Sequence, residues 1–134
     1  MLEKRALQVS IAIAALLPVS AGLWDITHGL SGSVGWADSH HRYLSGLLLA
    51  IGLGFWSAIP EIEARTARIR LLTALVVIGG LARLLGLALG DTATPMVVTA
   101  LVMELLVTPL LCLWQMRVID GPHGAGTHLR HIMP

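Results

Sequence analysis

Two charged residues, Arg83 and Glu104, lie within apolar segments that are long enough to cross a lipid bilayer. A charged side chain at that depth is costly, so it is normally paired and faces the interior of the protein, where it often marks a functional site. Arg83 lies eight residues before Asp91, and Glu104 lies nine residues after Pro95. If residues 90–95 form a tight turn, both side chains reach the same depth, about 12–14 Å below one membrane surface. The spacing therefore predicts an ion pair or a polar site, but it identifies no reaction.

A second group of polar residues flanks the first two apolar segments, on what we expect to be the same side of the membrane. Its members are Asp25, His28, His40, His41, Arg42 and Tyr43. Because arginine can extend several ångströms toward a membrane surface, these residues could rim an outward-facing polar pocket with Arg83 and Glu104 as its floor. The structural alternative is that Arg42 and Tyr43 anchor a helix end at the lipid–water interface. The two adjacent histidines would point about 100° apart on a helix, so we predict no metal site.

Composition places these residues in a membrane protein. Of 134 residues, 55% are hydrophobic and only 13% are charged, whereas soluble domains carry about 25% charged residues. The mean hydropathy is +0.78. Four apolar segments, at about 6–24, 43–59, 71–90 and 96–116, fit the roughly 17–25 residues of a membrane-spanning helix. The links between them are too short for a second domain, so the sequence predicts an all-α chain that forms one integral membrane four-helix bundle with antiparallel helices.

The basic residues indicate an orientation for this bundle. Arg42 alone lies on one side of the predicted membrane, and the other side holds Lys4, Arg5, Arg65, Arg68, Arg70, Arg117 and Arg130. Since cytoplasmic loops carry an excess of Lys and Arg, we expect a multi-pass protein of the cell inner membrane with both termini, including the tail 117–134, in the cytoplasm. The first segment also resembles a signal peptide with a cleavage site near Ala21. Its apolar run continues through Trp24, which favours a retained first helix.

Small residues recur at helical spacing and predict close packing of the helices. Gly46, Ala50 and Gly54 share one face of the second segment, and Gly86 and Gly90 form a GxxxG pair. Such faces let helix backbones approach closely where lipid supplies no hydrophobic drive for association. The contact could lie within the bundle, with a second copy of the chain, or with another membrane subunit.

The sequence argues against thiol chemistry, haem binding and nucleic-acid binding. The single cysteine, Cys112, has no partner for a disulfide or a CxxC centre, so we expect it to be buried and inert. Haem ligation by two histidines needs matching depths on facing helices; we expect His28 to lie in a loop and predict no cofactor. The basic residues are accounted for by membrane topology, which excludes nucleic acid as a partner.

The chain also resembles a known family. The string HHRYLSG at residues 40–46 is similar to the H-x-R-Y-L-S-G signature of the bacterial membrane family called domain of unknown function 4345. The segment 79–83 is similar as well, and so is Glu104 followed by Pro109 and Trp114. The resemblance covers about residues 10–115 and implies a four-helix membrane fold without an assigned activity. By the resemblance, the family pattern falls on His40, Arg42, Tyr43, Arg83 and Glu104, and His41 takes a variable position.

Three functions remain open. In the first, the protein binds or carries a small amphipathic ligand, such as a lipid, an isoprenoid or a quinone-like molecule, whose polar or anionic head is held by Arg83 and the histidines. In the second, it is a structural or accessory subunit of a membrane complex, with Arg83 and Glu104 as an ion pair that fixes helix packing. In the third, it is a membrane enzyme of the isomerase type in which Glu104 exchanges protons.

Overall fold

In the computed structural model, residues 2–29, 35–62 and 64–120 are described, and they are mostly helical. Helix α1 spans Leu2–His28, α2 spans Trp36–Ala58 and α3 spans Thr66–Ala88. The fourth helix has three consecutive parts: α4 (Pro95–Val102), the π-helical turn η1 (Met103–Val107) and α5 (Thr108–Asp120). No strand occurs in these three ranges, and the predicted all-α fold is confirmed.

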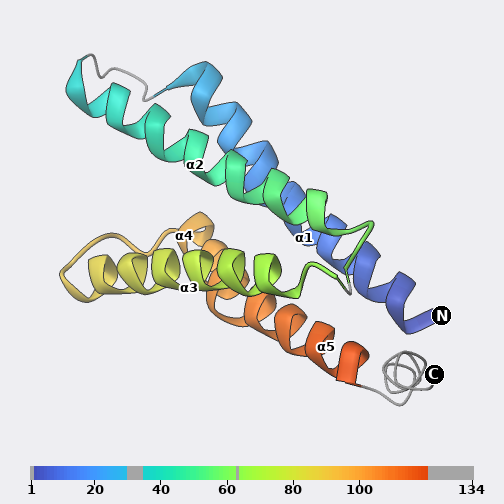
Figure 1. Cartoon of the computed structure of the whole chain (residues 1–134). Coiled ribbons are helices and arrows are strands. Elements are labelled where there is room, and N and C mark those ends of the chain that lie inside the picture. The colour runs from blue at the N-terminus through green and yellow to red at the C-terminus, as the bar shows by residue number, and fades with distance from the viewer. Residues whose placement is uncertain (1, 30–34, 63, 121–134) are drawn as a thin grey trace, which may run out of the picture.

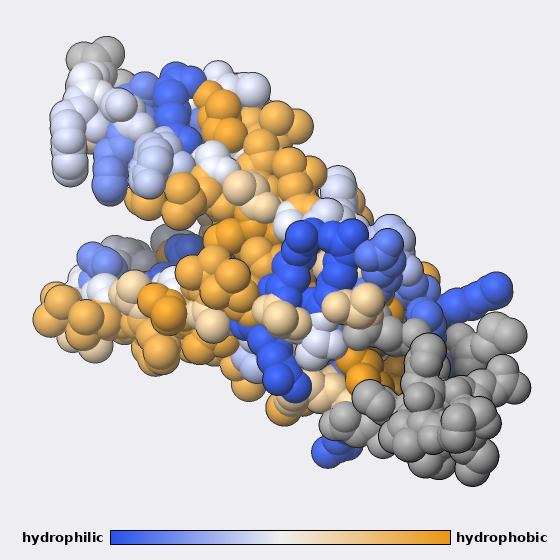
Figure 2. Space-filling view, viewed as in Figure 1, coloured by the Kyte–Doolittle hydropathy of each residue, from blue (hydrophilic) through white to orange (hydrophobic). Residues whose placement is uncertain are grey.

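The four helices form two hairpins (Figure 1). Helix α1 packs along α2, and α3 packs along the fourth helix. The hairpins meet at the end that holds the start of α1, the α2–α3 connection and the end of α5, which we call the closed end. They diverge toward the open end, which holds the α1–α2 and α3–α4 connections. The space between the hairpins at the open end, visible in the space-filling view of Figure 2, is called the wedge below.

The buried core lies toward the closed end and is tied together by two amide side chains. Its apolar members are Leu7, Ile11, Ala15, Phe55, Ala58, Ile62, Ile69 and Cys112. The fully buried Gln115 donates from Nε2 to the carbonyl oxygen of Ile62 at 2.6 Å. Gln8 of α1 donates from Nε2 to the carbonyl oxygen of Ile59 at 2.8 Å. The α2–α3 connection is thus held by both the first and the last helix, and the expected burial of Cys112 is confirmed.

Most of the remaining helix surface is hydrophobic (Figure 2). Helices α1, α3 and the continuous segment Pro95–Ile119 are each long and apolar enough to cross a membrane. Helix α2 is not among them, although the sequence predicted four spans. Its first turns carry Asp38, His40, His41 and Arg42, and these polar residues lower its hydropathy.

The first two helices extend further than their apolar segments. Helix α1 continues to His28 rather than ending near Trp24, and α2 begins at Trp36 rather than near Tyr43. The prediction that His28 lies in a loop is therefore wrong, and much of the segment 25–42 is helical. The physical reason is that hydropathy marks the apolar middle of a helix, whereas backbone hydrogen bonds continue through polar residues at its ends.

The turn between α3 and α4 agrees with the prediction. Gly90 has a φ of 112°, a left-handed conformation that favours glycine. Thr94 caps α4 by accepting a hydrogen bond from the backbone N–H of Val97 at 3.3 Å. At their other ends, these two helices also extend beyond the predicted apolar segments. Helix α3 begins at Thr66 rather than near residue 71, and α5 continues to Asp120 rather than ending near residue 116.

Helices α1 and α2 approach closely at Gly22. A Cβ atom at Gly22 would lie 2.7 Å from the carbonyl oxygen of Ser45 and 2.8 Å from the backbone nitrogen of Leu49. Because both neighbours are backbone atoms, they cannot move aside as the end of a side chain can. Gly46, which belongs to the small face predicted from the sequence, would meet nothing within 4 Å. Of the small face predicted from the sequence, Gly54 makes a close contact, with Leu72 of α3, whereas the α1–α2 contact uses Gly22.

We predict that Gly22→Ala destabilises the protein by about 1–3 kcal/mol, because the added methyl group forces the two backbones apart. Gly46→Ala is the control, and its effect should stay below about 1 kcal/mol because its Cβ enters open space. The measurement is reversible unfolding in detergent, followed by circular dichroism. Equal stabilities of the two variants would show that α1 and α2 do not pack at Gly22.

Candidate functional site

Arg83 of α3 and Glu104 of η1 form a forked ion pair. The Arg83 Nε donates to Glu104 Oε2 at 3.2 Å, and its Nη2 donates to Oε1 at 3.1 Å. Two parallel hydrogen bonds between a guanidinium and a carboxylate are the strong form of this contact. The Arg83 side chain is 41% exposed and the Glu104 side chain 16%. Direct contact also confirms that the two residues lie at the same depth, as the turn at 90–95 predicted.

A glycine lets the helices that carry the pair come together. Gly80 lies three residues before Arg83, about one turn toward the closed end. A Cβ atom at Gly80 would lie 2.8 Å from Cδ2 of Leu105 and 2.9 Å from Cβ of Glu104. The absence of a side chain at this position therefore allows η1 to approach α3, and the ion pair forms one turn further along.

The backbone around Glu104 is a π-helical turn, a feature that often occurs at functional sites. Pro109 has no N–H to donate to the preceding turn. Just before it, the backbone N–H of Thr108 donates to the carbonyl oxygen of Met103, and the Thr108 hydroxyl donates to the same oxygen at 2.8 Å. The wider turn accommodates the N–H that Pro109 lacks, and Glu104 faces Arg83 from within it.

Near the open end, charged residues of α2 hold α1. The His41 Nε2 lies 3.6 Å from Oδ2 of Asp25. The Arg42 Nε donates to Oδ2 of Asp38 at 2.9 Å, and its Nη1 donates to the carbonyl oxygen of Ile26. Asp38 was not singled out from the sequence, although its position four residues before Arg42 is the spacing of a helical ion pair. These residues already have protein partners and join the two helices of one hairpin.

The other predicted site residues of this hairpin carry exposed aromatic rings. His28 stacks on Trp24, with ring centroids 3.9 Å apart, and His40 stacks on Trp36, with centroids 5.0 Å apart. Tyr43 is 64% exposed. Since Tyr43 lies three residues after His40, the two share one face of α2, on the side opposite the contacts with α1.

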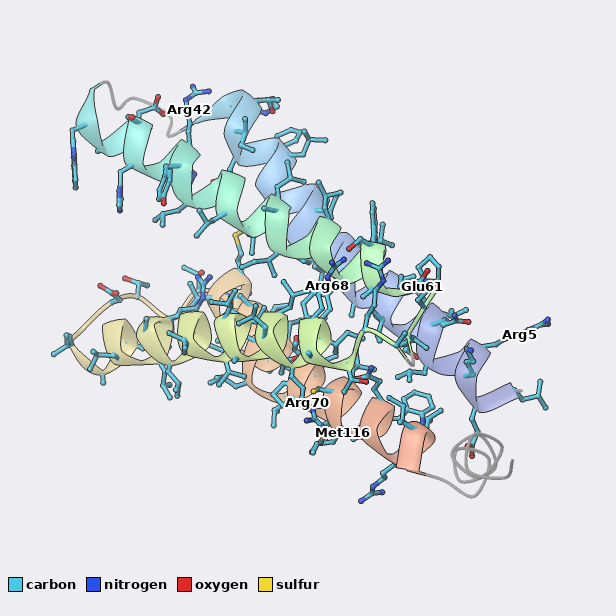
Figure 3. All side chains as sticks on the ribbon, in the orientation of Figure 1. Arg5, Arg42, Glu61, Arg68, Arg70 and Met116 are labelled. Carbon is cyan, nitrogen blue, oxygen red and sulfur yellow. The ribbon has the colours of Figure 1, made fainter. Side chains whose placement is uncertain are left out.

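The structure thus separates the predicted site into two groups, one on each hairpin. Arg83 and Glu104 belong to α3 and η1, and the remaining residues belong to α1 and α2; Figure 3 shows Arg42 near the open end of that hairpin. No hydrogen bond or ion pair joins the two groups within the described part of the chain. A shallow hollow on α5, lined by Leu110, Leu113, Trp114 and Arg117, contains none of these residues.

We expect a double-mutant cycle of Arg83→Ala and Glu104→Ala on unfolding in detergent to give a coupling above about 1 kcal/mol, because the paired groups hydrogen-bond each other directly. The control cycle uses the solvent-exposed pair Arg65–Glu61, whose Nε–Oε2 distance is 2.9 Å. Exposed pairs of this spacing contribute about 0.3–0.5 kcal/mol. A coupling no larger than that of the control would contradict a role of the ion pair in packing.

Two adjacent glycines offer a second, sharper comparison. Gly80→Ala should lower stability by about 1–3 kcal/mol because its Cβ meets Glu104 and Leu105. Gly79→Ala should change stability by less than about 1 kcal/mol, since a Cβ at Gly79 would meet nothing within 4 Å. The readout is the denaturant midpoint in detergent. Equal midpoints would contradict the close approach of α3 and η1.

Comparison with known proteins identifies a family. Residues 6–115 match the model of a family described as Domain of unknown function (DUF4345). No match was found among curated proteins or solved structures. The matched segment covers most of the chain and includes both groups of the candidate site. The chain therefore belongs to the Domain of unknown function (DUF4345) family, as the resemblance of its motifs predicted.

Proposed function

We propose that this chain is a multi-pass protein of the inner membrane that binds a small amphipathic ligand in the wedge between its hairpins. The ligand is a lipid, an isoprenoid or a quinone-like molecule. Its polar head lies beside Arg83 and Glu104, and its apolar tail lies along the hydrophobic helices. In this proposal the helices run antiparallel across the membrane, both termini are cytoplasmic and the open end faces outward.

The exposure of Arg83 within an apolar surface carries the proposal. Although Arg83 is forked on Glu104, its side chain is 41% exposed and its Nη1 donates no hydrogen bond to any described residue. The neighbouring Leu81 and Leu84 are exposed as well. In hydrocarbon, an N–H without a partner costs several kcal/mol, so this group needs an acceptor that the chain does not supply. The polar head of a bound ligand would supply it.

The distribution of basic side chains supports the proposed orientation. Arg5 lies near the start of α1 and Arg68 and Arg70 lie in the first turns of α3, next to the α2–α3 connection, whereas Arg42 lies near the open end (Figure 3). A positive excess marks the cytoplasmic side of a bundle. With the closed end in the cytoplasm, the wedge opens toward the outer half of the membrane, where the ion pair would lie.

A structural role is the second candidate function. It is favoured by the direct hydrogen bonds between Arg83 and Glu104. A forked pair between α3 and η1 fixes the packing of these two segments without any ligand. In this alternative, the protein is an accessory subunit of a membrane complex, and the exposed Arg83 is covered by another subunit. The two candidates differ in what Arg83 contacts in the membrane.

Native mass spectrometry of the protein extracted gently with its own lipids separates them. We expect a small molecule to remain bound to the wild type and to be lost from Arg83→Ala, because the head group loses its main hydrogen-bond donor. The control is Arg70→Ala, which removes an exposed arginine from the other end of the same helix and should keep the molecule bound.

A bare protein in all three samples would overturn the ligand-binding proposal. Co-purification of another membrane protein with the wild type, lost in Arg83→Ala, would instead establish the structural role. The mass of a retained small molecule would distinguish a lipid from an isoprenoid or a quinone-like compound.

A further inference from the structure

The contact between α2 and α3 sets the relative position of the two walls of the wedge. A Cβ atom at Gly54 of α2 would lie 3.1 Å from Cδ2 of Leu72 of α3. From this contact both helices run toward the open end, α2 backward along the chain and α3 forward (Figure 1). Tyr43 lies 11 residues before Gly54, and Arg83 lies 11 residues after Leu72. The two residues are therefore displaced equally from the point where the hairpins touch.

Eleven residues correspond to about three helical turns, so each residue returns to the face of its helix that makes the contact. Each also lies about 16 Å from the contact along its helix axis. Tyr43 and Arg83 thus face the wedge at the same depth from opposite walls. His40, one turn beyond Tyr43 on the same face of α2, is stacked on Trp36 and extends this wall as a strip of aromatic rings.

The charges of the wedge limit the chemistry of a head group that fits between the walls. Arg83 and Glu104 neutralise each other. The groups left to act at their depth are the N–H donors on Arg83 Nη1 and the hydroxyl of Tyr43, and the ring of His40, stacked on Trp36, lies one turn further toward the open end. An anionic head would have to compete with the Glu104 carboxylate for the guanidinium and would be repelled by it. An uncharged oxygen, such as a carbonyl, can accept from both donors and leave the ion pair in place.

We infer that Tyr43 forms the second wall of the ligand site, and that the ligand has an uncharged head whose oxygen accepts hydrogen bonds from Tyr43 Oη and Arg83 Nη1. The inference rests on the proposed function. It assigns Tyr43 a role different from that of an interfacial anchor, whose hydroxyl meets water and lipid head groups. An anchoring hydroxyl can be removed without any effect on ligand binding.

The test is the binding of a benzoquinone with a decyl tail to the protein in lipid nanodiscs, followed by quenching of tryptophan fluorescence. The probe is uncharged and carries two carbonyl acceptors. Tyr43→Phe should weaken binding about 5- to 10-fold, the effect of one lost hydrogen bond. Ser45→Ala is the matched control, because it removes a hydroxyl that bonds the His41 carbonyl on the opposite face of α2. Its affinity should equal that of the wild type.

The outcomes separate the inference from the proposed function. Binding that is weakened by Arg83→Ala but is unchanged in Tyr43→Phe would overturn the inference and leave the proposed function intact. If decyl phosphate, an anionic amphipath, bound as tightly as the quinone, the inference that the head group is uncharged would be wrong. If neither amphipath binds the wild type and the native protein carries no ligand, the proposed function fails, and the inference fails with it.

A second experiment tests the geometry without a ligand and in the membrane. In a Cys112→Ser background, Tyr43→Cys combined with Arg83→Cys should be linked by a bis-maleimide, because both positions face the wedge at one depth. Leu44→Cys combined with Arg83→Cys is the control, since residue 44 lies about 100° further around α2. Equal rates of linkage in the two double variants would contradict the assigned register.

Discussion

The need to satisfy charge on apolar helices governs the structure around Arg83. A lone charged side chain would cost several kcal/mol in hydrocarbon, and Arg83 and Glu104 avoid this cost on helices apolar enough to span a membrane by bonding each other. Two local features bring them together: Gly80 removes the side chain that would separate α3 from η1, and the π-helical turn before Pro109 holds Glu104 on the facing side. Gly80 and Pro109, two residue types that are unfavourable within a regular helix, thus allow this one polar contact to form.

Helix α2 divides its polar residues between two opposite faces. Neighbouring residues of a helix point about 100° apart, so the string at 40–46 supplies both faces at once. His41 and Arg42 turn toward α1 and hold the first hairpin together, whereas His40 and Tyr43 lie on the opposite face, which by our inference lines the wedge. Residues that look like one cluster in the sequence therefore lie on opposite faces of α2, and in our proposal only the second face meets a ligand.

Sequence patterns predicted some of this arrangement and missed other parts for physical reasons. Equal depth of Arg83 and Glu104 followed from a short turn with glycine and proline, because such a turn leaves little freedom. The start of α2 at Trp36 did not follow, since hydropathy falls where polar residues continue a helix. The core amides of Gln8 and Gln115 were also missed, because a glutamine shows no periodic pattern that reveals its backbone partner. Their contacts join segments far apart in the chain.

The ion pair alone does not explain how the two hairpins are placed. Arg83 and Glu104 both belong to the second hairpin, so their hydrogen bonds fix α3 against η1 and act on nothing across the wedge. The described contacts between the hairpins lie toward the closed end, where Gln8 and Gln115 hold the α2–α3 connection. Beyond Gly54 and Leu72, the facing walls carry Tyr43 and Arg83 at equal distance from that contact, and no hydrogen bond or ion pair links the described residues of the two walls. A head group that accepts from both walls would join the hairpins there, and its loss would let them separate. Ligand binding and the packing of the open end are, in this proposal, the same interaction.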